Sequence, residues 1–183
     1  MSVVLGLDLS LASTGVCVMR AAGTSTSTIE TKGKADDGYP AREARLGRIL
    51  GLVANVIPFD VDLVVVEAPS YSSGGVGTWD RAGLWWGVVM GVRSFGHPLA
   101  LVPPSNRAMY ATGRGNASKP TVMAAAMRTY PQAVIHNDNE ADAVVLAAMG
   151  LHWLGQPRAQ VPPKNLTALD GCVWPSRDSI RTT

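Results

Sequence analysis

Three acidic residues stand where this sequence would otherwise be expected to carry apolar side chains. Asp8 lies in the middle of an apolar strand pattern, Glu67 closes a run of valines and leucines, and Asp142 lies in an apolar helix pattern. A buried carboxylate is costly unless a basic side chain or a metal ion compensates its charge. Two alternatives follow for Asp8: a basic partner elsewhere in the fold, or further acids that gather beside it to hold a cation.

Each acid also has an ordinary structural explanation. Asp8 could cap a turn, Glu67 could pair with an arginine, and Asp142 could lie in the first turn of a helix, where negative charge is favourable. Taken together, acids from separate elements, without accompanying His or Cys, favour a hard cation such as Mg²⁺ or Mn²⁺ with oxygen ligands. Two such ions roughly 4 Å apart activate a water and stabilise the leaving oxygen in phosphodiester hydrolysis.

The acids must be positioned by strands and helices of the fold. Along the chain, three strand patterns come first, and further strand patterns then alternate with helical ones. Strand patterns occupy residues 3–9, 15–19, 24–32, 61–69 and 98–102. The run at 61–69 is almost entirely Val and Leu, which is typical of a strand covered on both faces. Helical patterns occupy residues 36–57, about 80–95, 103–113, 117–130 and 139–155. This order predicts an α/β fold, with a mixed sheet and helices on its faces.

Length and composition set further limits. The chain has 183 residues, 46% of them hydrophobic, and a net charge of +2, which suits one domain with a sizeable core. The sequence has no apolar run long enough to span a membrane and no pattern of a secretion signal. Cys17 and Cys172 lie far apart and indicate no disulfide framework. We therefore expect a cytoplasmic protein that does not associate with membranes.

Four segments carry a resemblance to a known family. They are GLDLSLASTGV at 6–16, VVVEAP at 64–69, VPPSNRAMYATGRGNASKPTV at 102–122 and NEADAVVLAAM at 139–149. In this order and spacing the chain resembles the RuvC-type Holliday-junction resolvases of the ribonuclease H-like superfamily, over about residues 3–152. The resemblance implies a mixed five-stranded sheet, three antiparallel strands followed by parallel ones, flanked by helices. The style of the chain, with its C-terminal extension, suggests a bacteriophage-encoded member that acts in the host cytoplasm.

The resemblance implies a role for each acid. Asp8, Glu67 and Asp142 correspond to catalytic acids that hold two Mg²⁺ ions, for which Mn²⁺ can substitute. Where the family has its remaining acid, this sequence has Asn139, a neutral ligand that adds less charge to a metal site. Asp138 is an alternative ligand, because it lies four residues before Asp142 and shares its helix face. Which of the two reaches the metal stays open.

The resemblance and the local charge also indicate DNA contacts. Lys119 corresponds to a basic residue near the scissile phosphate, where it would be catalytic and would bind DNA; otherwise it is an ordinary exposed lysine at a helix start. Arg107 and Arg114 lie in the same stretch, 101–130, which contains no acid. Tyr71, on a Ser/Gly loop, would stack on a base at the junction crossover, although an ordinary loop tyrosine is an equal alternative.

We expect residues 1–155 to form a nuclease domain and residues 156–183 a Pro-rich extension that packs loosely or becomes ordered on a partner. The expected activity is that of a crossover junction endodeoxyribonuclease acting on four-way and other branched DNA. The family forms two-fold dimers, and a dimer through the helix with Trp85 and Trp86 would match a two-fold substrate.

Three alternatives differ in function class. The chain could be a non-catalytic branched-DNA-binding protein, in which Asn139 marks a decayed site. It could also be a ribonuclease H or flap-type nuclease. The turn DLSLASTG at residues 8–15 resembles the phosphate-binding turn of actin-like kinases, but those need two such halves and a longer chain.

Overall fold

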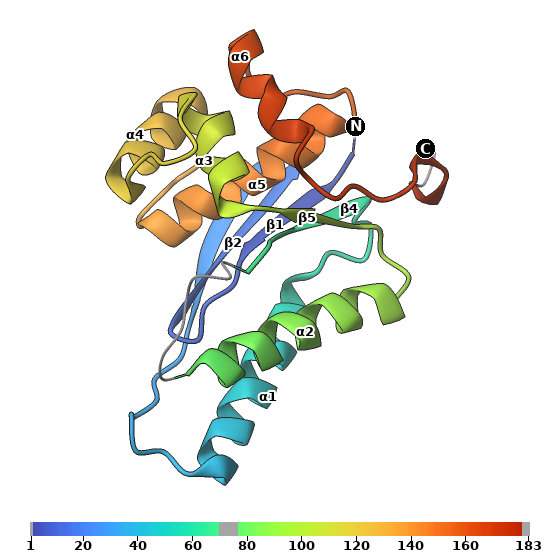
Figure 1. Cartoon of the computed structure of the whole chain (residues 1–183). Coiled ribbons are helices and arrows are strands. Elements are labelled where there is room, and N and C mark those ends of the chain that lie inside the picture. The colour runs from blue at the N-terminus through green and yellow to red at the C-terminus, as the bar shows by residue number, and fades with distance from the viewer. Residues whose placement is uncertain (1, 70–76, 181–183) are drawn as a thin grey trace.

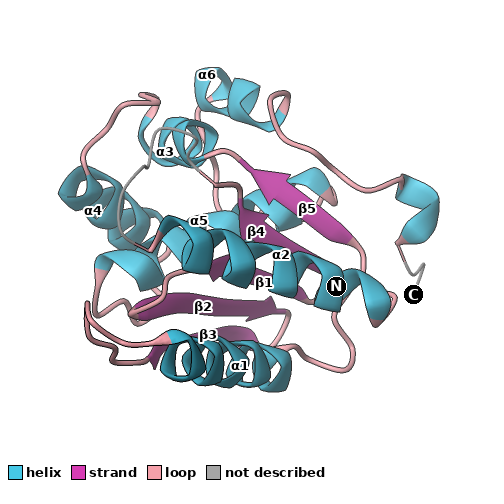
Figure 2. Ribbon diagram, turned by 60° about the horizontal axis from the view of Figure 1, so that its bottom comes forward, coloured by secondary structure: helices cyan, strands magenta, loops and turns pink. Residues whose placement is uncertain are grey.

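The computed structural model describes residues 2–69 and 77–180, and in this part of the chain five strands form one sheet. The strands are β1 (Val4–Asp8), β2 (Ser13–Arg20), β3 (Gly23–Glu30), β4 (Leu63–Glu67) and β5 (Leu99–Val102). Their order is β3-β2-β1-β4-β5 (Figure 2). The first three strands pair antiparallel, whereas β4 and β5 run parallel to β1. The predicted mixed α/β sheet is confirmed.

Helices cover both faces of the sheet (Figure 1). One face carries α1 (Tyr39–Val56) and α2 (Thr78–Ser94). The other face carries α3 (Pro104–Thr112), α4 (Lys119–Thr129), α5 (Asp138–Trp153) and the short α6 (Pro163–Leu166), with the 3₁₀ turns η1 (Thr167–Leu169) and η2 (Arg177–Ser179) nearer the C-terminus. None of the helices in the described ranges combines the length and the apolar character needed to span a bilayer.

The alternation of side chains along β4 divides the core between the two faces. Leu63 and Val65 pack in the cluster formed with α5, while Val64 and Val66 pack in the cluster formed with α1 and α2. All four are fully buried, as expected of a strand covered on both sides. Since successive side chains point to opposite faces, Glu67 lies on the same face as Val65, toward α5.

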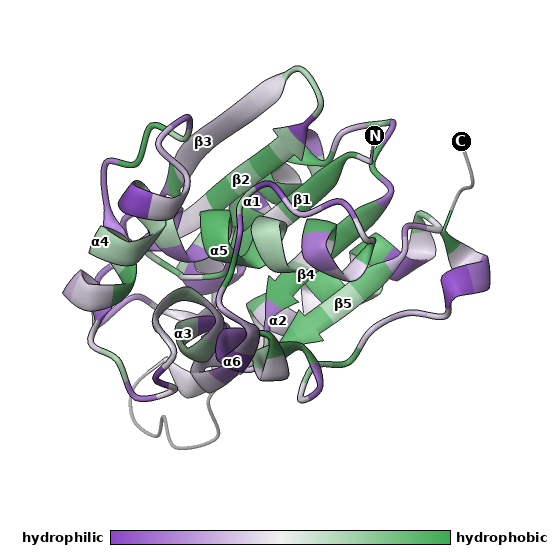
Figure 3. Cartoon of the chain, turned by 90° about the horizontal axis from the view of Figure 1, so that it is seen from above, coloured by the Kyte–Doolittle hydropathy of each residue, from purple (hydrophilic) through white to green (hydrophobic). Residues whose placement is uncertain are grey.

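Helix α5 lies directly against the sheet because two glycines let the backbones meet. A Cβ atom at Gly6 would lie 2.2 Å from the carbonyl oxygen of Ala143, and one at Gly15 would lie 2.0 Å from that of Asn139. No side chain fits in this space, so glycine is required at both positions. Every residue of α5 from Glu140 to Leu151 is buried. Figure 3 shows the apolar character of this helix and the adjoining strands, and the paler, Ser/Thr-rich β3 at the edge.

The C-terminal segment packs back onto the body. Val173 forms an antiparallel bridge with β5, and the ring of Trp174 stacks on Trp153 with centroids 5.2 Å apart. The guanidinium of Arg177 lies 4.3 Å from the centroid of the Trp153 ring and donates to the Trp153 carbonyl oxygen. The described part of this extension, residues 156–180, is thus docked on its own chain.

Candidate active site

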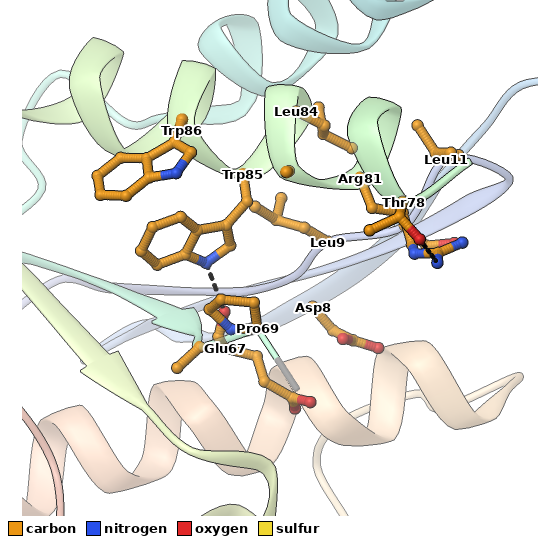
Figure 4. Close-up of a pocket in the computed structure, with 13 residues that line it drawn as sticks. Asp8, Leu9, Leu11, Glu67, Pro69, Thr78, Arg81, Leu84, Trp85 and Trp86 are labelled. Carbon is orange, nitrogen blue, oxygen red and sulfur yellow. Dashed lines mark hydrogen bonds between the residues drawn. The ribbon is translucent and has the colours of Figure 1, made fainter. Parts of the chain in front are cut away.

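The three acids singled out in the sequence meet at one place. Asp8 and Glu67 are the last residues of β1 and β4, which are parallel neighbours, so the two strands end at the same edge of the sheet. Asp8 follows Gly6 by two residues and therefore also faces α5. Figure 4 shows both carboxylates directed toward the α5 ribbon. Asp142 lies in the second turn of that helix and is 2% exposed.

A fourth residue, Arg107 of α3, joins two of these acids. Its Nε donates to Glu67 Oε2 at 2.5 Å, and its Nη1 donates to Asp142 Oδ1. Helix α3 begins directly after β5, the neighbour of β4, and this connection carries Arg107 to the site. Arg107 is 7% exposed. The basic partner considered for Asp8 therefore exists, although its hydrogen bonds go to the other two acids.

Burial and mutual repulsion leave strong electrostatic strain in the group. Burial, together with the charges of Glu67 and Asp142, raises the pKa of Asp8 to about 8. Burial likewise raises the pKa of Asp142 to about 6 and also raises the pKa of Glu67, in both cases against the opposing charge of Arg107. One guanidinium does not compensate three carboxylates, and an additional cation is the physical remedy.

The donor set fits a hard divalent ion, since it consists of carboxylate oxygens in a site that needs positive charge. As the side chains lie, however, no group of three or more His, Cys, Asp and Glu residues in the described ranges is arranged to hold a metal. Ion pairs with Arg107 hold one oxygen each of Glu67 and Asp142. The acids thus have the chemistry of a metal site, but two of them are paired with an arginine.

The two remaining candidate ligands lie at the rim of the site, and each has a hydrogen-bond partner there. Asp138 accepts a hydrogen bond from Lys119 Nζ at 2.7 Å, and both side chains are partly exposed. Asn139 donates from its amide to Ser13 Oγ at 2.9 Å. The positive charge of Lys119 nevertheless acts on all three acids, because it lowers the pKa of Asp8, Glu67 and Asp142.

The residues predicted to contact DNA differ in their exposure. Arg114 is exposed on the loop after α3, where Gly113 adopts a left-handed conformation with φ of 76°. Lys119 is exposed at the start of α4, whereas Arg107 is buried among the acids. Tyr71 lies outside the described residues.

A pocket of about 450 Å³ opens beside the acids (Figure 4). It lies between the ends of β1 and β4 and the first half of α2, and its lining includes Asp8, Glu67, Arg81, Trp85 and Trp86. The pocket gives the acid group an open, largely apolar flank toward α2.

The two tryptophans of α2 differ in environment. Trp85 packs against the core and donates from its indole nitrogen to the carbonyl oxygen of Glu67 at 2.9 Å. Trp86 is 56% exposed. Trp85 is thus explained by the fold, where it anchors the end of β4, and only Trp86 is left for an interface.

Sequence reasoning placed Arg107 on the DNA rather than between the acids. A signal was present, because Arg107 is the charged residue of a helix whose neighbours Ala108 and Tyr110 are buried. A charged residue in a buried pattern calls for a partner of opposite charge, as Asp8 does. Pairing such residues across the sequence would have suggested the contact.

Comparisons with known proteins bear on the fold. No family model matches the sequence, and no match was found among curated proteins. Among solved structures, the chain is similar to Thermus thermophilus RuvC, with a TM-score of 0.64 and 19% identity over 87% of this chain and 99% of that chain. It is also similar to T. thermophilus RuvC in complex with a Holliday junction substrate, with a TM-score of 0.65 and 17% identity over 88% and 99% of the two chains. The chain therefore has the RuvC-type, ribonuclease H-like fold predicted from its sequence.

Proposed function

We propose that this protein is a metal-dependent endonuclease that hydrolyses phosphodiester bonds in branched DNA, above all in four-way junctions. The observation that carries the proposal is the convergence of Asp8, Glu67 and Asp142 from three separate elements on a RuvC-type fold. Support for the substrate comes from the similar T. thermophilus protein, whose structure was solved with a Holliday junction. We also propose a bacteriophage origin and action in the host cytoplasm, as the overall character of the sequence with its C-terminal extension suggests.

In this proposal the three acids would hold Mg²⁺ or Mn²⁺, and the bound ion would supply activation of water and neutralisation of charge. The oxygen of the attacking water would form a bond to phosphorus while the bond from phosphorus to the 3′ oxygen breaks. The water gives up a proton to solvent and the departing 3′ oxygen takes one up, which leaves a 5′-phosphate and a 3′-hydroxyl. Lys119, exposed at the rim and paired with Asp138, would exchange this pairing for the DNA backbone and stabilise the developing charge. Arg114 and Tyr71 would contact the arms and the crossover.

A homodimer belongs to the proposal, because two active sites are needed for two opposed strands. Helix α2 offers a suitable face: Trp79, Trp86 and Met90 are spaced seven and four residues apart, and are 86%, 56% and 61% exposed. Such spacing puts them on one side of a helix. Exposed apolar side chains gathered in this way are typical of an interaction surface.

The test is cleavage of a labelled immobile four-way junction beside linear duplex, three-way and RNA–DNA hybrid substrates, each with Mg²⁺, Mn²⁺ or EDTA. Wild type should make paired nicks in the junction that require metal. Asp8→Asn should abolish them, while Asp36→Asn, which removes an exposed carboxylate, should not. Equal cutting of three-way forms would widen the activity to branched DNA in general, and preferred cutting of the hybrid would indicate a ribonuclease H.

A second candidate is a branched-DNA-binding protein without catalysis. The observation that favours it is the arginine among the acids, together with the neutral Asn139, since both reduce the attraction for metal ions. Tight junction binding without cutting in either metal would establish this second function and refute the first.

A further inference from the structure

The C-terminal segment is fastened to both ends of helix α3. The last carbonyl groups of a helix have no partner within the helix, and that of Tyr110 accepts a hydrogen bond from Asn165 Nδ2 at 3.0 Å. In the first turn of α3, Asn106 donates from its amide to the carbonyl oxygen of Ala168 at 2.7 Å. Asn165 is 4% exposed. The segment therefore lies along α3, as Figure 3 shows for α6.

This packing places a lysine against the loop that follows α3. A Cβ atom at Gly113 would lie 2.8 Å from Cε of Lys164 and 3.2 Å from its Nζ, so the lysine side chain lies directly on the backbone of Gly113. Arg114 is the next residue, and both basic side chains are exposed. Within residues 2–69 and 77–180, neither of them forms an ion pair. Two cations from distant parts of the sequence thus meet on one surface.

The chain around these two cations contains no acidic residues. Residues 101–130, which include α3 and α4, have no Asp or Glu, and residues 143–169 have none either. The basic residues of these two stretches are Arg107, Arg114, Lys119, Arg128, Arg158 and Lys164. On a chain whose net charge is only +2, basic residues gathered in this way are typical of a surface that binds a polyanion.

The surface is continuous with the candidate active site. Gly113 follows Arg107 by six residues, or roughly 9 Å along a helix, and Arg107 lies among the acids. The loop then leads from Gly113 to Lys119, which bonds to Asp138 at the rim of the site. Duplex DNA carries one phosphate charge per about 1.7 Å of its axis. A duplex arm that reaches the acids therefore has phosphates to offer Arg114 and Lys164 as well.

We propose that Lys164 binds the phosphate backbone of a DNA arm together with Arg114, so that the C-terminal segment is part of the DNA interface. The inference deepens the proposed function and rests on it, because that function supplies DNA as the partner. Asn165 keeps the segment on α3, and Lys164 makes the contact. A contact with phosphate fixes the position of the DNA but reads no sequence, so Lys164 adds affinity without sequence preference.

The salt dependence of binding tests the inference without relying on cleavage. Fluorescence anisotropy measures the affinity of the full chain for a labelled immobile four-way junction and for a linear duplex, in EDTA and at increasing NaCl. The slope of log K against log salt reports the number of phosphate contacts. Lys164→Ala should weaken binding of both DNAs several-fold and make the slope shallower by roughly 1. Lys164→Glu should weaken binding further, because it places a negative charge against the phosphates.

Two variants serve as controls. Lys164→Arg keeps the positive charge and should retain the affinity and slope of the wild type. Arg48→Ala removes an exposed arginine of α1, on the opposite face of the sheet, and should change neither. Because Lys164 is exposed, its replacement should leave the Tm unchanged, which thermal unfolding verifies.

Wild-type affinity and slope in Lys164→Ala would overturn the inference, and so would a loss confined to the junction, which would place Lys164 at the crossover and not on an arm. Cutting is measured separately in Mg²⁺. A protein that cuts the junction but binds it equally well without Lys164 refutes the inference and leaves the proposed function intact. A protein whose binding depends on Lys164 but which cuts no DNA refutes the proposed nuclease and leaves the inference standing.

Discussion

Asp8, Glu67 and Asp142 repel one another at a place where Asp142 is buried and the other two are partly buried, and Arg107 compensates only part of their charge. Removing one partner of a buried ion pair is usually more costly than never having had the pair, because the other charge is left without compensation. The acids are therefore interdependent, and each is sensitive to pH and to added cations.

The pKa of Asp8 predicts how stability depends on pH. In the unfolded chain Asp8 loses its proton near pH 3.8, whereas burial and its acidic neighbours raise the pKa in the folded protein to about 8. Between these values the folded state binds a proton that the unfolded state has lost, so rising pH favours unfolding. In EDTA, the contribution of Asp8 to stability should decrease as the pH rises from about 4 to about 8, and the Tm should fall with it.

Thermal unfolding of wild type and Asp8→Asn over this range measures the effect. The variant should show a smaller decline with pH than wild type, and the exposed control Asp36→Asn should retain the wild-type decline. Mg²⁺ should raise the Tm of wild type most at the alkaline end, where the carboxylate is free to bind it. Parallel pH curves for wild type and Asp8→Asn would show that the pKa of Asp8 is not raised in the folded protein.

At the scale of elements, the site depends on how closely α5 approaches β1 and β2. Gly6 and Gly15 permit backbone contact with Ala143 and Asn139, which brings Asp142 over the ends of the strands that carry the other acids. A helix held away by an intervening side chain would carry Asp142 out of reach.

Gly15→Ala should therefore lower the free energy of unfolding by roughly 1–3 kcal/mol, the range for overpacked cores, and reduce cleavage along with it. Gly47→Ala is the matched control, because a Cβ there meets nothing within 4 Å on the exposed face of α1. Alanine in a helix should raise stability by roughly 0.5–1 kcal/mol. Urea denaturation measures both, and equal stability of the two variants would contradict the close packing of α5.

The docked C-terminal segment provides a second test at this scale. Trp174→Ala removes a ring stacked on Trp153 and should lower the free energy of unfolding by at least about 1 kcal/mol. Val173→Ala truncates a side chain that is 60% exposed while the backbone bridge of Val173 with Leu101 is kept, so it should change stability little. If Trp174→Ala left the free energy of unfolding unchanged, this stacking contact would not hold the segment in place.

At the scale of the whole molecule, the apolar face of α2 decides the oligomeric state in the proposed function. A charge introduced into an apolar interface is costly, because it loses its hydration without gaining a partner. Met90→Glu should therefore shift the protein from dimer to monomer in sedimentation velocity. Met127→Glu is the control, since Met127 is 46% exposed on α4, away from this face. Dimers that persist in Met90→Glu would place the interface elsewhere.

The sequence by itself predicted the order and type of the elements from β1 to α5, and it singled out three acids. Strand patterns alternate with period two and helical patterns with a period near 3.6, so local chemistry was enough to predict the sheet and its helices. The three acids were recognisable because a carboxylate in an apolar pattern is costly wherever the chain folds.

Tertiary structure alone decided what surrounds those acids. Arg107 lies 40 residues from Glu67 and 35 from Asp142 along the chain, and no local pattern shows that the three side chains meet. The same holds for the two tryptophans of α2, of which Trp85 is bonded to Glu67 and Trp86 faces outward. Charge compensation is a matter of distance in space. The sequence could therefore show that Asp8 needed a cation, but only the fold could bring an arginine to its neighbours.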